Sequence, residues 1–264
     1  FDLKLINEKR PHILDANTEK LLTEAQDALS TPSNVYGMFS NADLEFEDAI
    51  DKDGQAYPLT QGTFIKYLES DDRELRASAF RNVYKAYGAH NNTLGATLAG
   101  EVKKNVFNAR THHYRSARER ALSNNHIPEA VYDNLIKTVH KYLPLLHRYT
   151  KLRQELLGLD DLKMYDLYTP LVKDVKFEMP YEEAKSWMLK ALEPMGEEYL
   201  NVVKEGLDNR WVDVYENKGK RSGGYSSGGH LTNPFILLNW SDTVSDLYTL
   251  VHEFGHSAHL SLIH

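Results

Sequence analysis

Hydrophobic residues recur every three or four positions between residues 244 and 258, which is the period of one helical face. Three residues of types that often cap a helix, Ser241-Asp242-Thr243, precede this pattern. The pattern therefore predicts an amphipathic helix with one face in the protein core. The expected core positions on that helix are Val244, Leu247, Val251, Phe254 and Ala258.

Helical patterns also dominate the chain up to about residue 159. Asn17 or Thr18 is a candidate cap for the first helix, and the run 31–34 is expected to end it. Pro144 lies inside the last of these patterns and is expected to kink that helix or to split it in two. The predicted helices are residues 1–30, a helix opened by the acidic stretch 71–76, residues 92–112 and residues 128–157.

Short β-segments are expected at three places. Partial alternation over residues 44–50, followed by the turn signal Asp53-Gly54 and residues 56–59, predicts a hairpin. Residues 211–215 and 233–240 have strand-like patterns, and the second leads directly into the C-terminal helix. These elements together predict a mainly α protein with a small β element beside that helix.

Composition excludes several classes of protein. The chain has 264 residues, of which 41% are hydrophobic and 26% are charged, as in soluble globular proteins. A formal net charge of −7 argues against a general nucleic-acid binder or a polybasic membrane-surface protein. The absence of cysteine excludes disulfides, thiolate catalysis and cysteine-ligated zinc. No apolar run approaches the length of a membrane span, so none is expected.

The C-terminal helix carries the sequence His252-Glu253-Phe254-Gly255-His256, which has the form H-E-x-x-H. Residues four apart lie on the same helical face, so both imidazoles can point at one ion. Zinc lowers the pKa of its bound water to about 7, and a neighbouring carboxylate can take the proton and pass it to a leaving amine. A chance match in a chain with 12 histidines is the alternative. The helical context favours a zinc site at His252 and His256, with Glu253 as the catalytic base.

A glycine-rich stretch lies between the last two predicted strands, with five glycines from Gly219 to Gly229. Glycines permit close backbone approach and unusual dihedral angles. One interpretation is a flexible surface loop. A phosphate cradle is another, but neither of the usual glycine-rich phosphate motifs occurs. The third is an edge whose backbone pairs with an extended peptide. The candidate residues for such pairing are Gly224, Tyr225, Ser226, Ser227 and Gly228.

Residues 217–259 contain N-K-G-K-R-S-G-G-Y-S-S-G, then T-N-P-F-I-L-L-N-W, then T-L-V-H-E-F-G-H-S-A-H. In these segments the chain resembles the oligoendopeptidase F family, which is related to thimet oligopeptidase and the Pz-peptidases. The resemblance implies a cytoplasmic, mostly helical zinc metallopeptidase with a deep channel that admits short peptides. It implies that His252 and His256 hold zinc, that Glu253 is the general base and that the glycine-rich stretch borders the channel. His230 stands where an aromatic residue such as Tyr is expected, so its role is left open.

The same resemblance implies parts that this sequence does not contain. The third zinc ligand is expected to be a Glu about two dozen residues beyond the motif, whereas the chain ends at His264. His259 follows His256 by three residues, but three ligands on one straight helix cannot surround an ion tetrahedrally. We therefore expect a structural or supporting role for His259, and one zinc ion whose third ligand lies beyond the chain end. Because the chain begins with Phe1, a fragment lacking N- and C-terminal parts is expected.

The predicted organisation has two parts. Residues 1–175 form a helical scaffold region with a short β-hairpin, and residues 176–264 form the truncated N-terminal part of a catalytic zinc-peptidase core. The expected function is zinc-dependent endopeptidase hydrolysis of short oligopeptides by Glu-assisted attack of zinc-bound water. The alternatives are a truncated, non-catalytic peptide-binding fragment and a zinc exopeptidase such as a carboxypeptidase. Short peptides are the expected partners, with no nucleic acid and no membrane, and the oligomeric state is not specified.

Overall fold

A computed structural model describes residues 2–172, 178–229 and 231–262 of the chain. Contacts within the chain define two compact units. The first comprises Phe1–Asp43 and Tyr87–Asp160, and the second comprises Leu44–Ala86 and Asp161–His264. This grouping differs from the predicted division at residue 175, because it joins the hairpin region to the C-terminal part. His230, whose role was left open, lies outside the described residues.

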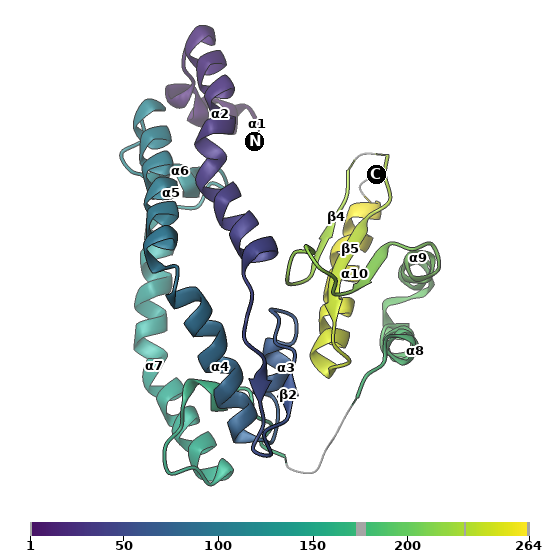
Figure 1. The fold of residues 1–264 in the computed structure, drawn as a ribbon. Helices are drawn as coiled ribbons and strands as arrows, with labels where there is room; N and C mark the ends of the chain where they lie inside the picture. The colour runs from purple at the N-terminus through teal and green to yellow at the C-terminus, as the bar shows by residue number, and fades with distance from the viewer. Residues whose placement is uncertain (1, 173–177, 230, 263–264) are drawn as a thin grey trace. The chain divides into compact units, whose positions relative to one another are not determined.

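The first unit is helical, and α2, α5 and α7 are its long helices (Figure 1). They are α1 (Asp2–Lys9), α2 (Ala16–Met38), α5 (Asn91–Thr111), α6 (Ala117–Ser123) and α7 (Glu129–Leu157), with a 3-10 turn at Arg10–His12. The capping residue of α2 is Asp15, whose carboxylate accepts hydrogen bonds from the N–H groups of Asn17 and Thr18. The prediction that Asn17 or Thr18 is itself the cap is therefore wrong by two or three positions.

Pro32 and Pro144 lie inside α-helices of this unit. α2 continues through Pro32 to Met38, so the prediction that this helix ends at residues 31–34 is wrong. α2 packs on α5, where a Cβ on Gly100 would lie only 2.7 Å from Pro32 Cγ, so the proline is accommodated by close helix packing. Pro144 lies within one continuous α7, so this helix is not split in two. Among the described residues, no helix combines the length and the apolar composition that a bilayer span requires.

The second unit begins with the predicted hairpin, which is confirmed. Strands β1 (Ala49–Ile50) and β2 (Ala56–Tyr57) pair in antiparallel register around a turn in which Gly54 has a φ of +83°. Helices α3 (Phe64–Leu68) and α4 (Arg73–Gly88) follow. Along the apolar stripe of α4, Leu75, Ala79 and Val83 are buried, whereas Phe80 and Tyr87 are only partly buried.

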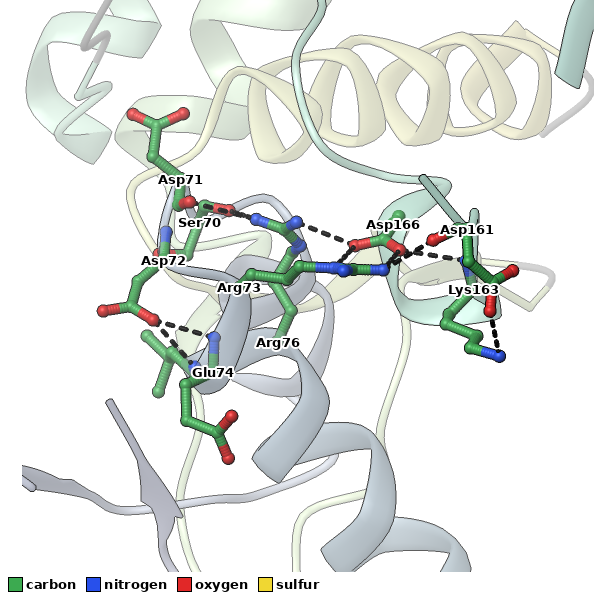
Figure 2. Close-up of polar contacts among 10 residues, drawn as sticks. Ser70, Asp71, Asp72, Arg73, Glu74, Arg76, Asp161, Lys163 and Asp166 are labelled. Atoms are coloured by element: carbon green, nitrogen blue, oxygen red, sulfur yellow. Dashed lines mark hydrogen bonds and ion pairs between the residues drawn. The ribbon is translucent and has the colours of Figure 1, made fainter. Parts of the chain in front are cut away.

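A buried carboxylate connects α4 to the segment 161–166 (Figure 2). Asp166 is fully buried and accepts hydrogen bonds from the guanidinium groups of Arg76, at 2.7 Å, and Arg73, at 2.9 Å. The backbone N–H of Lys163 donates a further bond to Asp166. Burial by itself raises the pKa of Asp166, but these three donors outweigh it and hold the pKa below its ordinary value. This cluster joins two segments of the second unit that are far apart in sequence.

Among the residues that the structure describes, the C-terminal half of the second unit holds a three-stranded sheet and three α-helices. These elements are α8 (Tyr181–Ala191), α9 (Glu197–Asp208), β3 (Val212–Tyr215), β4 (Tyr225–Ser227), β5 (Phe235–Trp240) and α10 (Val244–Leu262). The strand order is β3-β5-β4, with β3 parallel and β4 antiparallel to β5. α10 runs beside β4 and β5 (Figure 1). The observed fold is thus mainly α with a small sheet beside the C-terminal helix, as predicted.

The core of this half lies where α10 meets the sheet and the helices α8 and α9. Phe254 of α10 is fully buried, and a Cβ on Gly206 of α9 would lie 2.7 Å from its ring. Leu250 and Ala258 are also buried, whereas Val244 is 36% exposed. Of the predicted core positions of α10, Phe254 and Ala258 are buried, Leu247 and Val251 are partly buried against this core, and Val244 is exposed; Leu250 was not among the predicted positions. Other buried members of this core are Met179, Met188, Val203, Trp211, Ile236 and Leu238.

Candidate active site

The start of α10 is held by a reciprocal cap. The Thr243 hydroxyl accepts a hydrogen bond from the N–H of Asp246, and the Asp246 carboxylate accepts one from the N–H of Thr243 at 2.9 Å. The same carboxylate accepts the N–H and hydroxyl of Ser241. This is a capping box, which satisfies donors that a helix start leaves free. The cap confirms the predicted helix start and sets α10 directly after β5.

His252 and His256 project from an exposed face of α10. Their Nε2 atoms lie 3.1 Å apart, and their ring centroids lie 4.8 Å apart with the planes at 85°. This convergence is the arrangement that the four-residue spacing predicts. At the usual Zn–N distance, two nitrogens this far apart subtend an angle of roughly 100° at a shared ion, close to tetrahedral. The pair therefore fits two positions of a zinc coordination shell.

Glu253 lies about 100° round the helix from His252, towards the buried side of α10. Glu253 is only 7% exposed, although it lies next to the exposed His252. Phe254 and Ser257 are fully buried. A carboxylate in such a site is largely shielded from bulk water, which strengthens its interactions with nearby charge. The motif therefore presents two imidazoles to solvent and keeps its carboxylate inside.

A third ligand does not join the histidine pair within the described part of the chain. There, no group of three His, Cys, Asp or Glu side chains is placed to hold an ion. His259 is exposed on the same helix but does not complete the pair. A catalytic zinc usually has three protein ligands and one open position, so the described histidine pair alone falls one ligand short of such a site.

Strand β4 is an edge strand beside α10. Its residues Tyr225, Ser226 and Ser227 pair with Leu237, Ile236 and Phe235 of β5. It ends the strand order, so no strand of the described chain pairs with its other side. An edge strand presents backbone donors and acceptors that an added extended peptide can use. The flexible-loop interpretation therefore does not hold for residues 225–227, which are part of the sheet.

Glycines bring β4 close to α10. A Cβ on Gly224 would lie 2.8 Å from Thr249 Cγ2 of α10, so a side chain there would force the two elements apart. Gly223, with a φ of +88°, precedes it in a conformation that L side chains rarely adopt. The Asn239 side-chain amide donates to the carbonyls of Arg221 and Gly223 and holds this part of the stretch. Two glycines thus set the approach of the strand to the helix that carries the histidines.

Comparison with known proteins agrees with this architecture. The sequence profile of peptidase family M3 matches residues 66–263, three quarters of the chain. The chain belongs to peptidase family M3. Residues 1–46 match a second profile, described as oligopeptidase F. The family M3 segment includes α10, both histidines and β4.

Relatives of this family M3 chain are longer. Oligopeptidase PepF of Bacillus subtilis (strain 168) is 58% identical over 254 residues, which cover 96% of this chain and 38% of that protein. The oligoendopeptidase F homolog of Lactococcus lactis subsp. lactis (strain IL1403) is 43% identical over 251 residues, which cover 95% and 42%. The crystal structure of oligoendopeptidase-F from Enterococcus faecium aligns with a TM-score of 0.63 and 42% identity, over 78% of this chain and 39% of that one. The chain thus spans about two fifths of the length of the curated relatives it matches.

Some residues of this region of the family M3 chain were not found by sequence reasoning. A cavity of about 200 Å³ lies near the start of β4, and Lys66, Asn239 and Asp246 are among its lining residues. Lys66 donates to the carbonyl of Ser241 at 2.9 Å. Glu69 lies three residues after Lys66, and its pKa is raised mainly by burial and also by the nearby negative charge of Asp246. These side chains are distant in sequence and form no motif, so only the fold brings them together.

Proposed function

We propose that this chain carries the metal-binding helix and the peptide-binding edge of a zinc endopeptidase that hydrolyses short oligopeptides. The observation that carries the proposal is the convergence of His252 and His256 Nε2 to 3.1 Å on an exposed face of α10. Membership of peptidase family M3 supports it. The open edge of β4, which lies against the same helix, supports it further.

His252 and His256 would hold the zinc ion through their Nε2 atoms. When bound, zinc lowers the pKa of water to about 7 and polarises a carbonyl oxygen. A third protein ligand is proposed to come from residues outside the described part of the chain, because the described residues offer two. The two imidazoles orient each other on one helical turn, so little reorganisation is needed to receive an ion.

Glu253 is proposed to move the proton. It accepts a proton from the water that attacks the peptide carbonyl, as an oxygen–carbon bond forms and charge develops on the carbonyl oxygen. It then donates that proton to the amide nitrogen as the carbon–nitrogen bond breaks, so that the amine leaves neutral. A base that is 7% exposed exchanges protons with the bound reactants rather than with bulk water.

Residues Gly224 to Gly228 are proposed to pair with the backbone of the substrate. Main-chain hydrogen bonds at a strand edge depend little on the side chains of the added peptide, so peptides of varied sequence can bind. A net charge of −7 does not favour nucleic acid as a partner. We propose the cytoplasm as the compartment, from the resemblance to oligoendopeptidase F and the absence of cysteine.

One observation favours a second candidate function, that of a peptide-binding chain without catalysis. The observation is that the described residues offer two candidate ligands and not three. Two ligands hold zinc more weakly than three, since the loss of a residue that only hydrogen-bonds to a ligand already lowers zinc affinity by about 10–100-fold. Zinc analysis after dialysis, together with cleavage of an acetylated and amidated fluorogenic peptide, separates the two functions. The endopeptidase proposal predicts about one zinc per chain and internal cuts that a chelator abolishes.

Other outcomes of this experiment are equally specific. Peptide binding without zinc or cleavage would establish the second candidate. Cleavage of the same peptide with a free terminus, but not of the blocked peptide, would assign an exopeptidase such as a carboxypeptidase instead. If the chain binds neither zinc nor peptide, both proposals are wrong.

A further inference from the structure

One contact between β4 and α10 has no part in the proposed chemistry. Ser226 Oγ and Ser257 Oγ lie 2.8 Å apart, within hydrogen-bonding distance. Ser226 is the central residue of β4, and Ser257 directly follows His256 on α10. We propose that this hydroxyl pair is a positioning contact, which fixes the register of β4 along α10 and so aligns a paired peptide with the two imidazoles. The inference rests on the proposed function.

Successive side chains of β4 point to opposite faces of the strand, and the side chain of Ser226 points towards α10. Tyr225 and Ser227 are exposed, whereas Ser226 is partly buried and bonds to α10. Its cross-strand neighbour Ile236 is 1% exposed and belongs to the core. Because successive strand residues point to opposite faces, Ser226 is the residue of this three-residue strand that faces the helix.

The ladder with β5 fixes β4 within the sheet, but the apolar contacts that flank the hydroxyl pair set the distance of this edge from α10 and not its register along the helix. Gly224 lies against the methyl group of Thr249, and a Cβ on Gly228 would lie 3.6 Å from Leu260 Cδ1. Apolar contacts of this kind are non-directional, so they tolerate sliding of the strand along the helix. The hydrogen bond between the two hydroxyls is directional and short. Because Ser257 is fully buried, sliding of β4 along α10 would leave the Ser257 hydroxyl without a partner.

The Ser226–Ser257 pair lies close to the two histidines along α10. Gly224 contacts α10 at Thr249 and Ser226 contacts it at Ser257, and His252 and His256 lie between these two positions in the helix. The hydroxyl pair would therefore determine where a peptide paired with β4 lies along α10, relative to the two imidazoles. Catalysis is sensitive to such placement, since a displacement of about 1 Å can cost on the order of 100-fold in rate. Ser226 and Ser257 would act through the peptide strand and not on the reacting atoms.

The test compares Ser226→Thr with Ser226→Val in the whole chain. Both variants add nearly the same volume to a β-strand, but Thr keeps the hydroxyl and Val loses it. Cu²⁺, which imidazoles bind well, serves as a paramagnetic probe at the histidine pair. The readout is the line broadening that Cu²⁺ causes along a short acetylated and amidated peptide bound to the chain.

For the wild-type chain and for Ser226→Thr, broadening is expected to peak at one residue of the peptide. For Ser226→Val and for Ser257→Ala, the maximum is expected to be lost and the broadening to spread along the peptide. Ser245→Ala, which removes an exposed hydroxyl from α10, should behave as wild type. Circular dichroism of each variant checks that it folds, and Ser226→Ala replaces Ser226→Val if that variant does not.

Two results would overturn the inference, and they are distinguishable. Equal broadening profiles for Ser226→Thr and Ser226→Val would remove the positioning role while leaving the proposed function intact. A wild-type chain that binds neither Cu²⁺ nor the peptide would contradict the proposed function, and the inference with it.

Discussion

Arg76 donates a hydrogen bond to Asp166 at 2.7 Å, and both side chains are almost completely buried. The two residues are 90 positions apart, so the pair holds α4 to the segment that leads towards the C-terminal half of the second unit. Arg73 adds a second ion pair from the more exposed side, and the N–H of Lys163 occupies the same carboxylate. A buried charge that is this fully paired stabilises its surroundings only while every partner is present.

Removal of this carboxylate is expected to destabilise the protein strongly. Asp166→Ala leaves Arg76 buried without its counter-ion, a change that typically costs about 3–5 kcal/mol of unfolding free energy. Glu74→Ala, which breaks the exposed pair with Arg81, is the control and should cost less than about 1 kcal/mol. Urea unfolding of both variants makes the comparison. Similar losses in the two would contradict the account of this cluster.

The same cluster predicts a pH dependence of stability. The pKa of Asp166 is lowered in the folded protein, so the unfolded chain binds a proton first as the pH falls. Its contribution is complete above the ordinary aspartate pKa of about 3.9 and is lost as the pH falls through the lower folded value. Asp166→Asn should therefore reduce the slope of unfolding free energy against pH below about pH 4. An unchanged slope in urea titrations across this range would show that Asp166 does not contribute.

The extent to which sequence predicted this fold depends on how local the signal is. The helix from Val244 was predicted because its apolar period and its cap, Thr243 with Asp246, lie within a few residues of each other. The hairpin at Ala49–Tyr57 was predicted for the same reason, since a short glycine turn joins its strands. In contrast, Pro32 is read locally as a helix end, but α2 continues through it and packs there against Gly100 of α5.

In the candidate site too, the features that depend on local sequence were predicted and those that depend on the fold were not. His252 and His256 are found from spacing alone, since a helix places residues four apart on one face. The burial of Glu253 was not predicted, because it depends on which side of α10 the neighbouring elements cover. The bond between Ser226 and Ser257 spans 31 positions and joins two common residue types, so no pattern in the sequence marks it.

Close approach of β4 to α10 is expected to depend on Gly224. Gly224→Ala places a Cβ 2.8 Å from Thr249 Cγ2, and overpacking of this kind costs about 1–3 kcal/mol. Thr249→Ser removes that methyl group and should recover most of the loss in the double variant. Gly95→Ala, where a Cβ meets nothing within 4 Å inside α5, is expected to gain about 0.5–1 kcal/mol instead. Thermal unfolding of the four variants measures these differences, and additive losses in the double variant would refute the contact.

Glu253→Gln tests the proposed base. In a form of the enzyme that cleaves peptides, this variant should keep its metal and lose about 100- to 10,000-fold in kcat, because an amide cannot accept the proton. Glu205→Gln, the same chemical change at an exposed position of α9, should leave kcat unchanged. Steady-state kinetics on an internally quenched peptide supplies the measurement. Turnover by Glu253→Gln within a few fold of wild type would assign the proton transfer to another group.

Metal affinity of the histidine pair tests the central claim most directly. The measurement is a zinc competition titration of the wild-type chain, His252→Ala, His256→Ala and His259→Ala under identical conditions. The account predicts that each of the first two variants loses more than about tenfold in zinc affinity, since each removes one of two convergent ligands, and that His259→Ala matches wild type. Zinc affinity that is unchanged in both His252→Ala and His256→Ala would contradict it.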